Sequence, residues 1–104
     1  MELEAAAAVM SALGQTTRLK VVTLLADHEP TGLPASEIAD LVGTPRNTMS
    51  GHLGILSNAG IVTSSRSGRT ITYRLCQNVV ANIADIIGRL SPAKLPNVSK
   101  RRRV

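Results

Sequence analysis

A three-residue break between two short segments of helical apolar pattern constrains the fold of this chain more than any other feature. The break is Gly43-Thr44-Pro45, between a segment that begins at Pro34 and one that ends at Gly60. Glycine readily ends a helix, threonine is a good N-cap, and proline fits the first helical position, where no hydrogen-bonded N–H is lost. The sequence therefore predicts two short helices joined by a tight turn, the second running to about Ala59.

Each of these two predicted helices has one apolar face. Residues three and four positions apart lie on the same side of a helix, so such a face is expected to pack against a core. The inward positions are Ile38, Leu41 and Val42 in the first helix and Met49, Leu53 and Leu56 in the second.

Three more helices and a β-hairpin are predicted around this pair. The helices cover 2–13, a stretch from Thr16 or Thr17 to about His28, and 78–90, and the strands cover 61–66 and 70–75 around a turn at 67–69. In the second of these helices the predicted buried stripe is Leu19, Val21, Val22, Leu24 and Leu25. Two tightly joined helices followed by a hairpin form a winged helix-turn-helix pattern. We therefore predict a mainly α fold of about five helices and two antiparallel strands, with one domain over 1–90 and a basic, flexible tail over 91–104.

The core must be built almost entirely from aliphatic side chains. Tyr73 is the only aromatic residue other than histidine among 104 residues, and a core of this size is marginal for a monomer. The last predicted helix carries a wider apolar surface than one contact requires, formed by Val79, Val80, Ile83, Ile86, Ile87 and Leu90. A second copy of the chain is the expected partner, so the sequence predicts a homodimer.

Charge is distributed very unevenly along the chain. Residues 1–40 hold six acids and two bases, a net charge of −4, whereas residues 41–84 hold four arginines and no acid. Residues 85–104 add one acid and six bases, which gives +5 there and +5 overall. An acid-free middle segment predicts one face that meets a polyanion.

The polar face of the helix around 45–59 is the predicted site of contact with double-stranded DNA. Short donors and acceptors can approach base edges and phosphates closely, and Gly51 and Gly54 each weaken a helix by about 1 kcal/mol relative to alanine. The candidate DNA-contacting residues of this segment are Thr44, Arg46, Asn47, Thr48, Ser50, Gly51 and His52. Arg66 and Arg69 at the hairpin tip are further candidates, for phosphates or the minor groove.

From about Ala12 to Leu75 the chain resembles the ArsR/SmtB-type winged-helix repressors. The matching stretches are Leu13-Gly14-Gln15-Thr16-Thr17-Arg18-Leu19, Thr48-Met49-Ser50-Gly51-His52-Leu53 with Leu56 and Ala59-Gly60-Ile61-Val62, and Gly68-Arg69 with Tyr73-Arg74-Leu75. The resemblance implies a homodimer formed by the first and last helices. It also implies repression through an imperfect DNA palindrome, with base contacts from the region of Thr48, Ser50 and His52.

The resemblance implies two metal-sensor sites in the family, and neither is expected here. One is a Cys-x-Cys, whose positions are held by Pro34 and Ser36, and the other uses Asp and His on the last helix, which has Asp85 but no histidine. We therefore predict no cofactor and no metal. A small organic effector, a redox response of the lone Cys76, or no effector at all remain open.

Other functions and locations fit the sequence less well. His28 between Asp27 and Glu29 is read as a solvated turn rather than a metal site, and no catalytic set has credible spacing, so the chain is predicted not to be an enzyme. The alternative is a winged-helix protein–protein interaction module with nonspecific nucleic-acid affinity. RNA binding is disfavoured because exposed stacking aromatics are absent.

With one cysteine, acids near the start and no apolar run of about 18 residues, we expect a cytoplasmic protein with no membrane contact.

Overall fold

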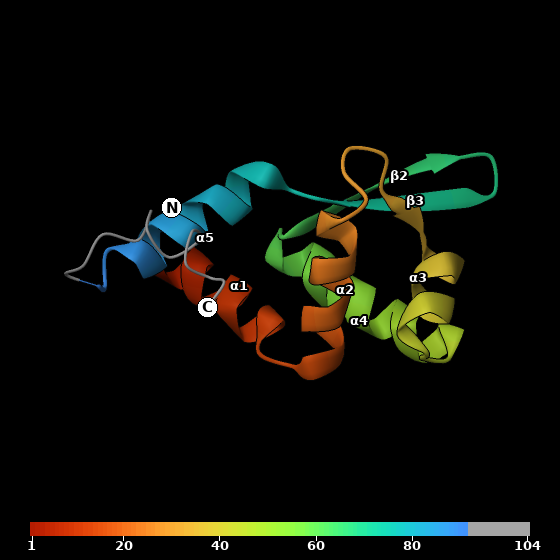
Figure 1. The fold of residues 1–104 in the computed structure, drawn as a ribbon, viewed down its shortest axis with the longest axis horizontal. Coiled ribbons are helices and arrows are strands. Elements are labelled where there is room, and N and C mark those ends of the chain that lie inside the picture. Colours follow the sequence, from red (N-terminus) through yellow and green to blue (C-terminus); the bar gives the residue numbers. More distant parts are fainter. Residues whose placement is uncertain (92–104) are drawn as a thin grey trace, which may run out of the picture.

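A computed structural model describes residues 1–91, and the predicted tail beyond Ser91 lies outside the described residues. The described chain forms five helices and a three-stranded antiparallel sheet (Figure 1). The elements in order are α1 (Leu3–Leu13), α2 (Thr16–Ala26), β1 (Leu33–Pro34), α3 (Ala35–Val42), α4 (Arg46–Ala59), β2 (Val62–Ser67), β3 (Thr70–Leu75) and α5 (Gln77–Gly88). The predicted mainly α winged helix-turn-helix fold is confirmed. No helix within residues 1–91 has both the length and the apolar character needed to cross a bilayer.

The turn between α3 and α4 is as tight as the sequence predicts. Gly43 adopts the left-handed conformation with φ +79°, and the backbone N–H groups of Gly43 and Thr44 both donate to the carbonyl of Ala39, at 2.9 and 3.0 Å. The N-cap of α4, however, is Pro45 and not Thr44, and the side chain of this N-cap residue makes no hydrogen bond. Within the first turn, Oδ1 of Asn47 accepts a 2.9 Å hydrogen bond from the backbone N–H of Thr48. A residue that precedes proline is pushed toward extended backbone, which keeps Thr44 one position further outside the helix.

The core lies where the helices cross and is aliphatic throughout. The largest fully buried side chains are those of Val9, Val21, Leu25, Ile38, Met49, Leu53, Leu56 and Val62. The inward face predicted for α4 is thus confirmed. Two other predicted core positions are wrong, because Leu19 is 49% exposed and Leu41 is 58% exposed. Apolar periodicity alone does not fix which edge of a broad stripe meets the neighbouring helices.

The start of α2 is capped by a residue other than the threonines that the sequence favours. The side-chain oxygen of Gln15 accepts a hydrogen bond of 2.8 Å from the backbone N–H of Arg18, whereas Thr16 and Thr17 lie inside the helix. The glutamine just before the helix therefore satisfies one of the free N–H groups at this end.

A third strand that the sequence did not predict completes the sheet. The strand order is β1-β3-β2, with Leu33 paired to Tyr73 in β3. The hairpin of β2 and β3 closes on a two-residue turn, Gly68-Arg69, and Gly68 has φ +63°. The short β1 therefore pairs with the middle of β3, directly before α3, and ties the hairpin to the helix-turn-helix.

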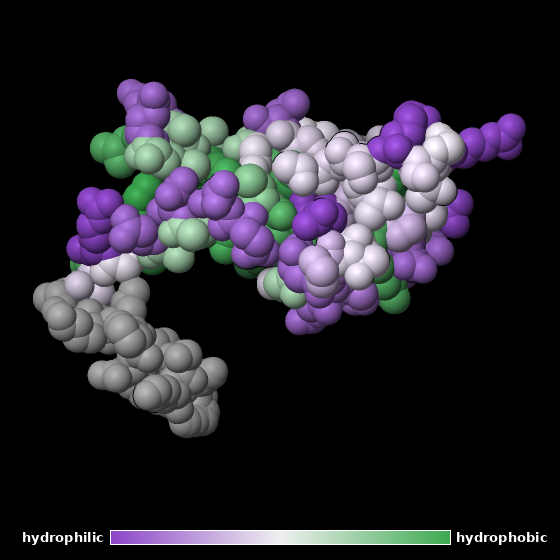
Figure 2. All heavy atoms as spheres, turned by 90° about the horizontal axis from the view of Figure 1, so that it is seen from above, coloured by the Kyte–Doolittle hydropathy of each residue, from purple (hydrophilic) through white to green (hydrophobic). Residues whose placement is uncertain are grey.

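The helix α5 has an apolar surface with little to cover it in the described chain. None of its residues is fully buried, and Ile87 remains 47% exposed. On α1, at the same end of the molecule, Leu3 is 73% exposed, and the hairpin projects from the opposite end (Figure 1). Figure 2 shows green, apolar surface concentrated toward the end that carries α5, with polar surface over most of the other.

Candidate nucleic-acid interface

The helix α4 presents its polar residues outward along its first two turns. Arg46, Asn47, Thr48, Ser50 and Gly51 are exposed, whereas Met49 and Leu53 on the other side are fully buried. No acidic residue occurs anywhere in α4. The face predicted to contact DNA is therefore free to meet an anionic surface.

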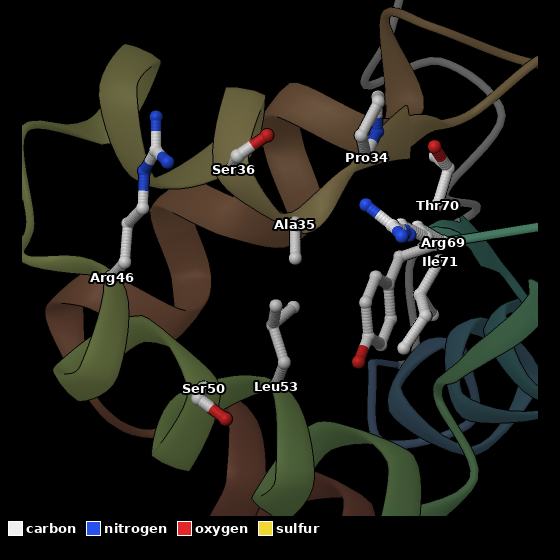
Figure 3. Close-up of a pocket in the computed structure, with 10 residues that line it drawn as sticks. Pro34, Ala35, Ser36, Arg46, Ser50, Leu53, Arg69, Thr70 and Ile71 are labelled. Atoms are coloured by element: carbon white, nitrogen blue, oxygen red, sulfur yellow. The ribbon is translucent and has the colours of Figure 1, made fainter.

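An open cleft of about 480 Å³ separates this face from the hairpin. It is lined by Pro34, Ala35, Ser36, Arg46, Ser50, Leu53, Arg69, Thr70, Ile71 and Tyr73. Arg46 and Arg69 stand on opposite sides of the cleft, with Ala35 and Leu53 between them (Figure 3). Two guanidinium groups, several hydroxyls and no carboxylate make this lining complementary to a phosphate backbone.

Arg46 forms an ion pair that the sequence did not predict. Its Nη2 atom lies 3.5 Å from Oδ2 of Asp40 on α3, and both side chains are about two-thirds exposed, at 70% and 66%. Exposed pairs of this kind contribute little to stability because water and salt screen them. A phosphate can therefore replace Asp40 as the partner of Arg46 at small cost.

The two arginines of the hairpin occupy different positions. Arg66 lies on β2 opposite Ile71, and its Nη1 donates a long, 3.5 Å hydrogen bond to the carbonyl of Gly68. Arg69 lies in the turn itself and reaches the cleft. Arg69 is therefore the better placed of the two to act together with α4.

His52 is a candidate residue with a contact, to Arg18, that the sequence did not predict. It is half-buried, and its Nδ1 atom lies 3.4 Å from Nη1 of Arg18 on α2. Arg18 and His52 are 34 positions apart, so only the crossing of α2 and α4 brings them together. Thr44, in the turn, is also partly buried, unlike the exposed candidates on α4.

The remaining candidates for chemistry are distributed over separate places. Cys76 is a half-buried free thiol at the N-cap of α5. The Nδ1 atom of His28 lies 3.0 Å from the carbonyl of Leu24, and a carboxylate oxygen of Glu29 accepts from the backbone N–H of Leu75 at 3.3 Å. Within residues 1–91 no group of three or more His, Cys, Asp or Glu side chains is gathered as a metal would require.

Comparison with known proteins agrees with this geometry. A family described as a helix-turn-helix domain matches residues 13–65. The HTH-type transcriptional repressor SmtB of Mycobacterium tuberculosis is 36% identical over 81 residues, which are 78% of this chain and 58% of that protein. An HTH-type transcriptional regulator of Methanocaldococcus jannaschii is 33% identical over 87 residues, 84% of this chain and 96% of its own length.

Solved structures give the same result. The homodimeric winged helix-turn-helix DNA-binding domain of Mb0332 from Mycobacterium bovis, described as a possible ArsR-family regulator, matches with a TM-score of 0.70 and 29% identity. The match covers 81% of this chain and 76% of that one.

Fold and site together define a winged helix-turn-helix protein. Its sequence relatives and structural neighbours assign it to one family within this class. The chain spans less than two thirds of the length of the SmtB repressor that it matches. The chain belongs to the ArsR/SmtB family of winged helix-turn-helix regulators.

Proposed function

We propose that this chain is a sequence-specific DNA-binding transcriptional regulator, a homodimeric repressor that acts on an imperfect palindrome in the cytoplasm. The observation that carries the proposal is the exposed, acid-free face of α4 beside a cleft flanked by Arg46 and Arg69. The relatives named as transcriptional repressors and regulators support it.

In this proposal α4 lies in the major groove and the hairpin follows the backbone. Thr48, Ser50 and His52 face base edges, and Arg46 and Arg69 bind phosphates on either side of the cleft, with Arg66 further out. Asn47 and Thr44 support phosphate contacts at the start of the helix. Gly51 has nothing within 4 Å of the place where a Cβ would sit, so its missing side chain leaves room for the DNA surface.

The phosphate contacts can be tested by a matched pair of arginine variants. Arg69→Ala is expected to weaken binding to all duplex sequences about equally, by about five- to tenfold, and to reduce the slope of log affinity against log salt by about 1. Fluorescence anisotropy with labelled duplexes over a salt series measures both. Arg89→Ala is the control, because Arg89 pairs with Asp85 on α5 at 2.6 Å, away from the cleft. Equal losses in the two variants, or a wild-type affinity that does not depend on salt, would point instead to the protein–protein interaction module.

The proposed dimer is formed by α1 and α5. Their exposed apolar residues lie at the end of the molecule opposite the hairpin, so two copies joined there can present both α4 helices to one duplex. The homodimeric state of the Mycobacterium bovis domain supports this arrangement.

A charge placed in this surface is expected to separate the copies. Ile87→Glu should convert a dimer to a monomer at micromolar concentration, because a carboxylate would lose its water in an apolar interface. Sedimentation equilibrium gives the mass. Leu41→Glu is the control, since Leu41 is a similarly exposed leucine on α3. If Ile87→Glu keeps the mass of the dimer, α5 is not the interface.

We further propose that this regulator lacks the metal sites of its family. Pro34 is the N-cap of α3 and Ser36 offers no thiolate, and Asp85 is already paired with Arg89. The alternatives are then control by an organic effector, control by a response of the Cys76 thiol, and DNA binding without any effector.

A further inference from the structure

Arg18 connects three helices through one guanidinium group. Its Nε donates a 2.6 Å hydrogen bond to the carbonyl of Ala12, near the end of α1, where helical carbonyls lack partners. Its Nη1 lies 3.4 Å from Nδ1 of His52 on α4. No carboxylate pairs with Arg18 among the described residues. The position of this cation is thus set by a carbonyl and an imidazole.

A hydrogen bond between Arg18 and His52 can run in only one direction, from Arg18 to His52. A guanidinium group has N–H donors and no acceptor, so Nδ1 of His52 must offer its lone pair. In a neutral imidazole the other nitrogen then carries the proton. This contact therefore favours the tautomer of His52 that carries its N–H at Nε2.

In the second histidine of the chain, His28, the same ring nitrogen faces a hydrogen-bond acceptor. Nδ1 of His28 lies 3.0 Å from the carbonyl oxygen of Leu24, which can only accept. This contact therefore favours the tautomer of His28 that carries its N–H at Nδ1. The two histidines of this chain are predicted to be opposite tautomers.

We propose that Arg18 is a positioning residue that sets what α4 can read: it fixes His52 as an Nε2–H donor, directed to a hydrogen-bond acceptor of DNA. The acceptors in the major groove are N7 and O6 of guanine, N7 of adenine and O4 of thymine. The proposal has two parts, the tautomer of His52 and the contact of His52 with DNA. Only the second part rests on the proposed DNA-binding function, because the tautomer is a property of the protein without DNA.

Nitrogen-15 NMR of the full chain without DNA tests the proposed tautomer of His52. At about pH 8.5, where free imidazole is neutral, long-range proton–nitrogen spectra identify the protonated nitrogen of each ring. We expect protonated Nε2 in His52 and protonated Nδ1 in His28. Protonated Nδ1 in His52 would overturn the inference.

Two variants separate positioning from a loss of charge. Arg18→Met removes the donors, and its two His52 nitrogen signals should move toward each other, as in a mixture of tautomers, while those of His28 stay. Lys20→Met is the control, because Lys20 is the other base on α2 and is exposed. Arg18→Lys keeps a donor and should retain part of the wild-type pattern if Arg18→Met does not fold. Unchanged His52 signals in both Arg18 variants would contradict the proposal.

Binding to a duplex that the protein selects from a mixed pool tests the proposed contact of His52 with DNA. Arg18→Met should weaken specific binding about twofold, because in an even mixture of tautomers only half of the molecules carry the proton at Nε2. His52→Asn removes this donor altogether, so it should cost less affinity in the Arg18→Met background than in the wild type. Additive losses in the double variant would overturn the role in reading. If no duplex binds at all, the proposed function fails, and the ring signals still decide the tautomers.

Discussion

Replacement of Gly32 by alanine is expected to lower the free energy of unfolding by about 3 kcal/mol. Gly32 is buried between α2 and β1 with φ +77°, where an L-residue costs roughly 1–2 kcal/mol. An added Cβ would also lie 2.4 Å from the carbonyl oxygen of Tyr73 and from Cγ of Arg74, so β3 would have to move. Overpacking of this kind costs typically 1–3 kcal/mol more. Urea denaturation measures the sum.

Gly43→Ala is the matched control for this prediction. Gly43 has almost the same backbone conformation, φ +79°, but nothing lies within 4 Å of the place where its Cβ would sit. Only the conformational penalty remains, so a loss of about 1 kcal/mol is expected. Equal losses at Gly32 and Gly43 would mean that the loop before β1 yields without disturbing the sheet.

Ser50→Asp is expected to weaken binding to duplex DNA by at least about 100-fold. Ser50 is exposed on the acid-free face of α4 and lines the cleft between Arg46 and Arg69. An aspartate there would face phosphates and pair with the arginines that should bind them, and like charges brought together in an interface cost several kcal/mol. Anisotropy titration at fixed salt measures the loss, and a thermal melt should show little change.

Asn58→Asp is the control for the charge itself. Asn58 is exposed on the same helix but lines a separate surface hollow with Ala8 and Ser11 of α1. The same added charge is expected to weaken binding by less than about threefold at this position, since screening shortens its reach to about 8–10 Å. If the two variants lose affinity equally, net charge and not the face of α4 controls binding.

The helix-turn-helix was predictable because its signals are local. Gly43 and Gly60 end α3 and α4 in the left-handed conformation, and the spacing of Met49, Leu53 and Leu56 fixes the buried face of α4. These signals depend on neighbouring residues only. The exposure of the polar residues of α4 follows directly, as the opposite face.

Features that depend on distant segments were not predictable in the same way. The strand β1 has two residues, one of them Pro34, too few to show any alternation, and it exists because β3 lies beside it. The contacts of Arg18 with His52 and of Arg46 with Asp40 require the crossing angles of packed helices. Leu19 and Leu41 were misplaced for the same reason.

The near absence of aromatic residues has a practical consequence for spectroscopy. Tyr73, His28 and His52 carry the only aromatic rings in the chain, so the aromatic region of a proton NMR spectrum contains three spin systems. Each ring reports on a different place: Tyr73 on the cleft, His52 on α4, and His28 on the end of α2. Without any added label, a titration with a ligand can therefore be assigned to one of these three places from the ring signals that move.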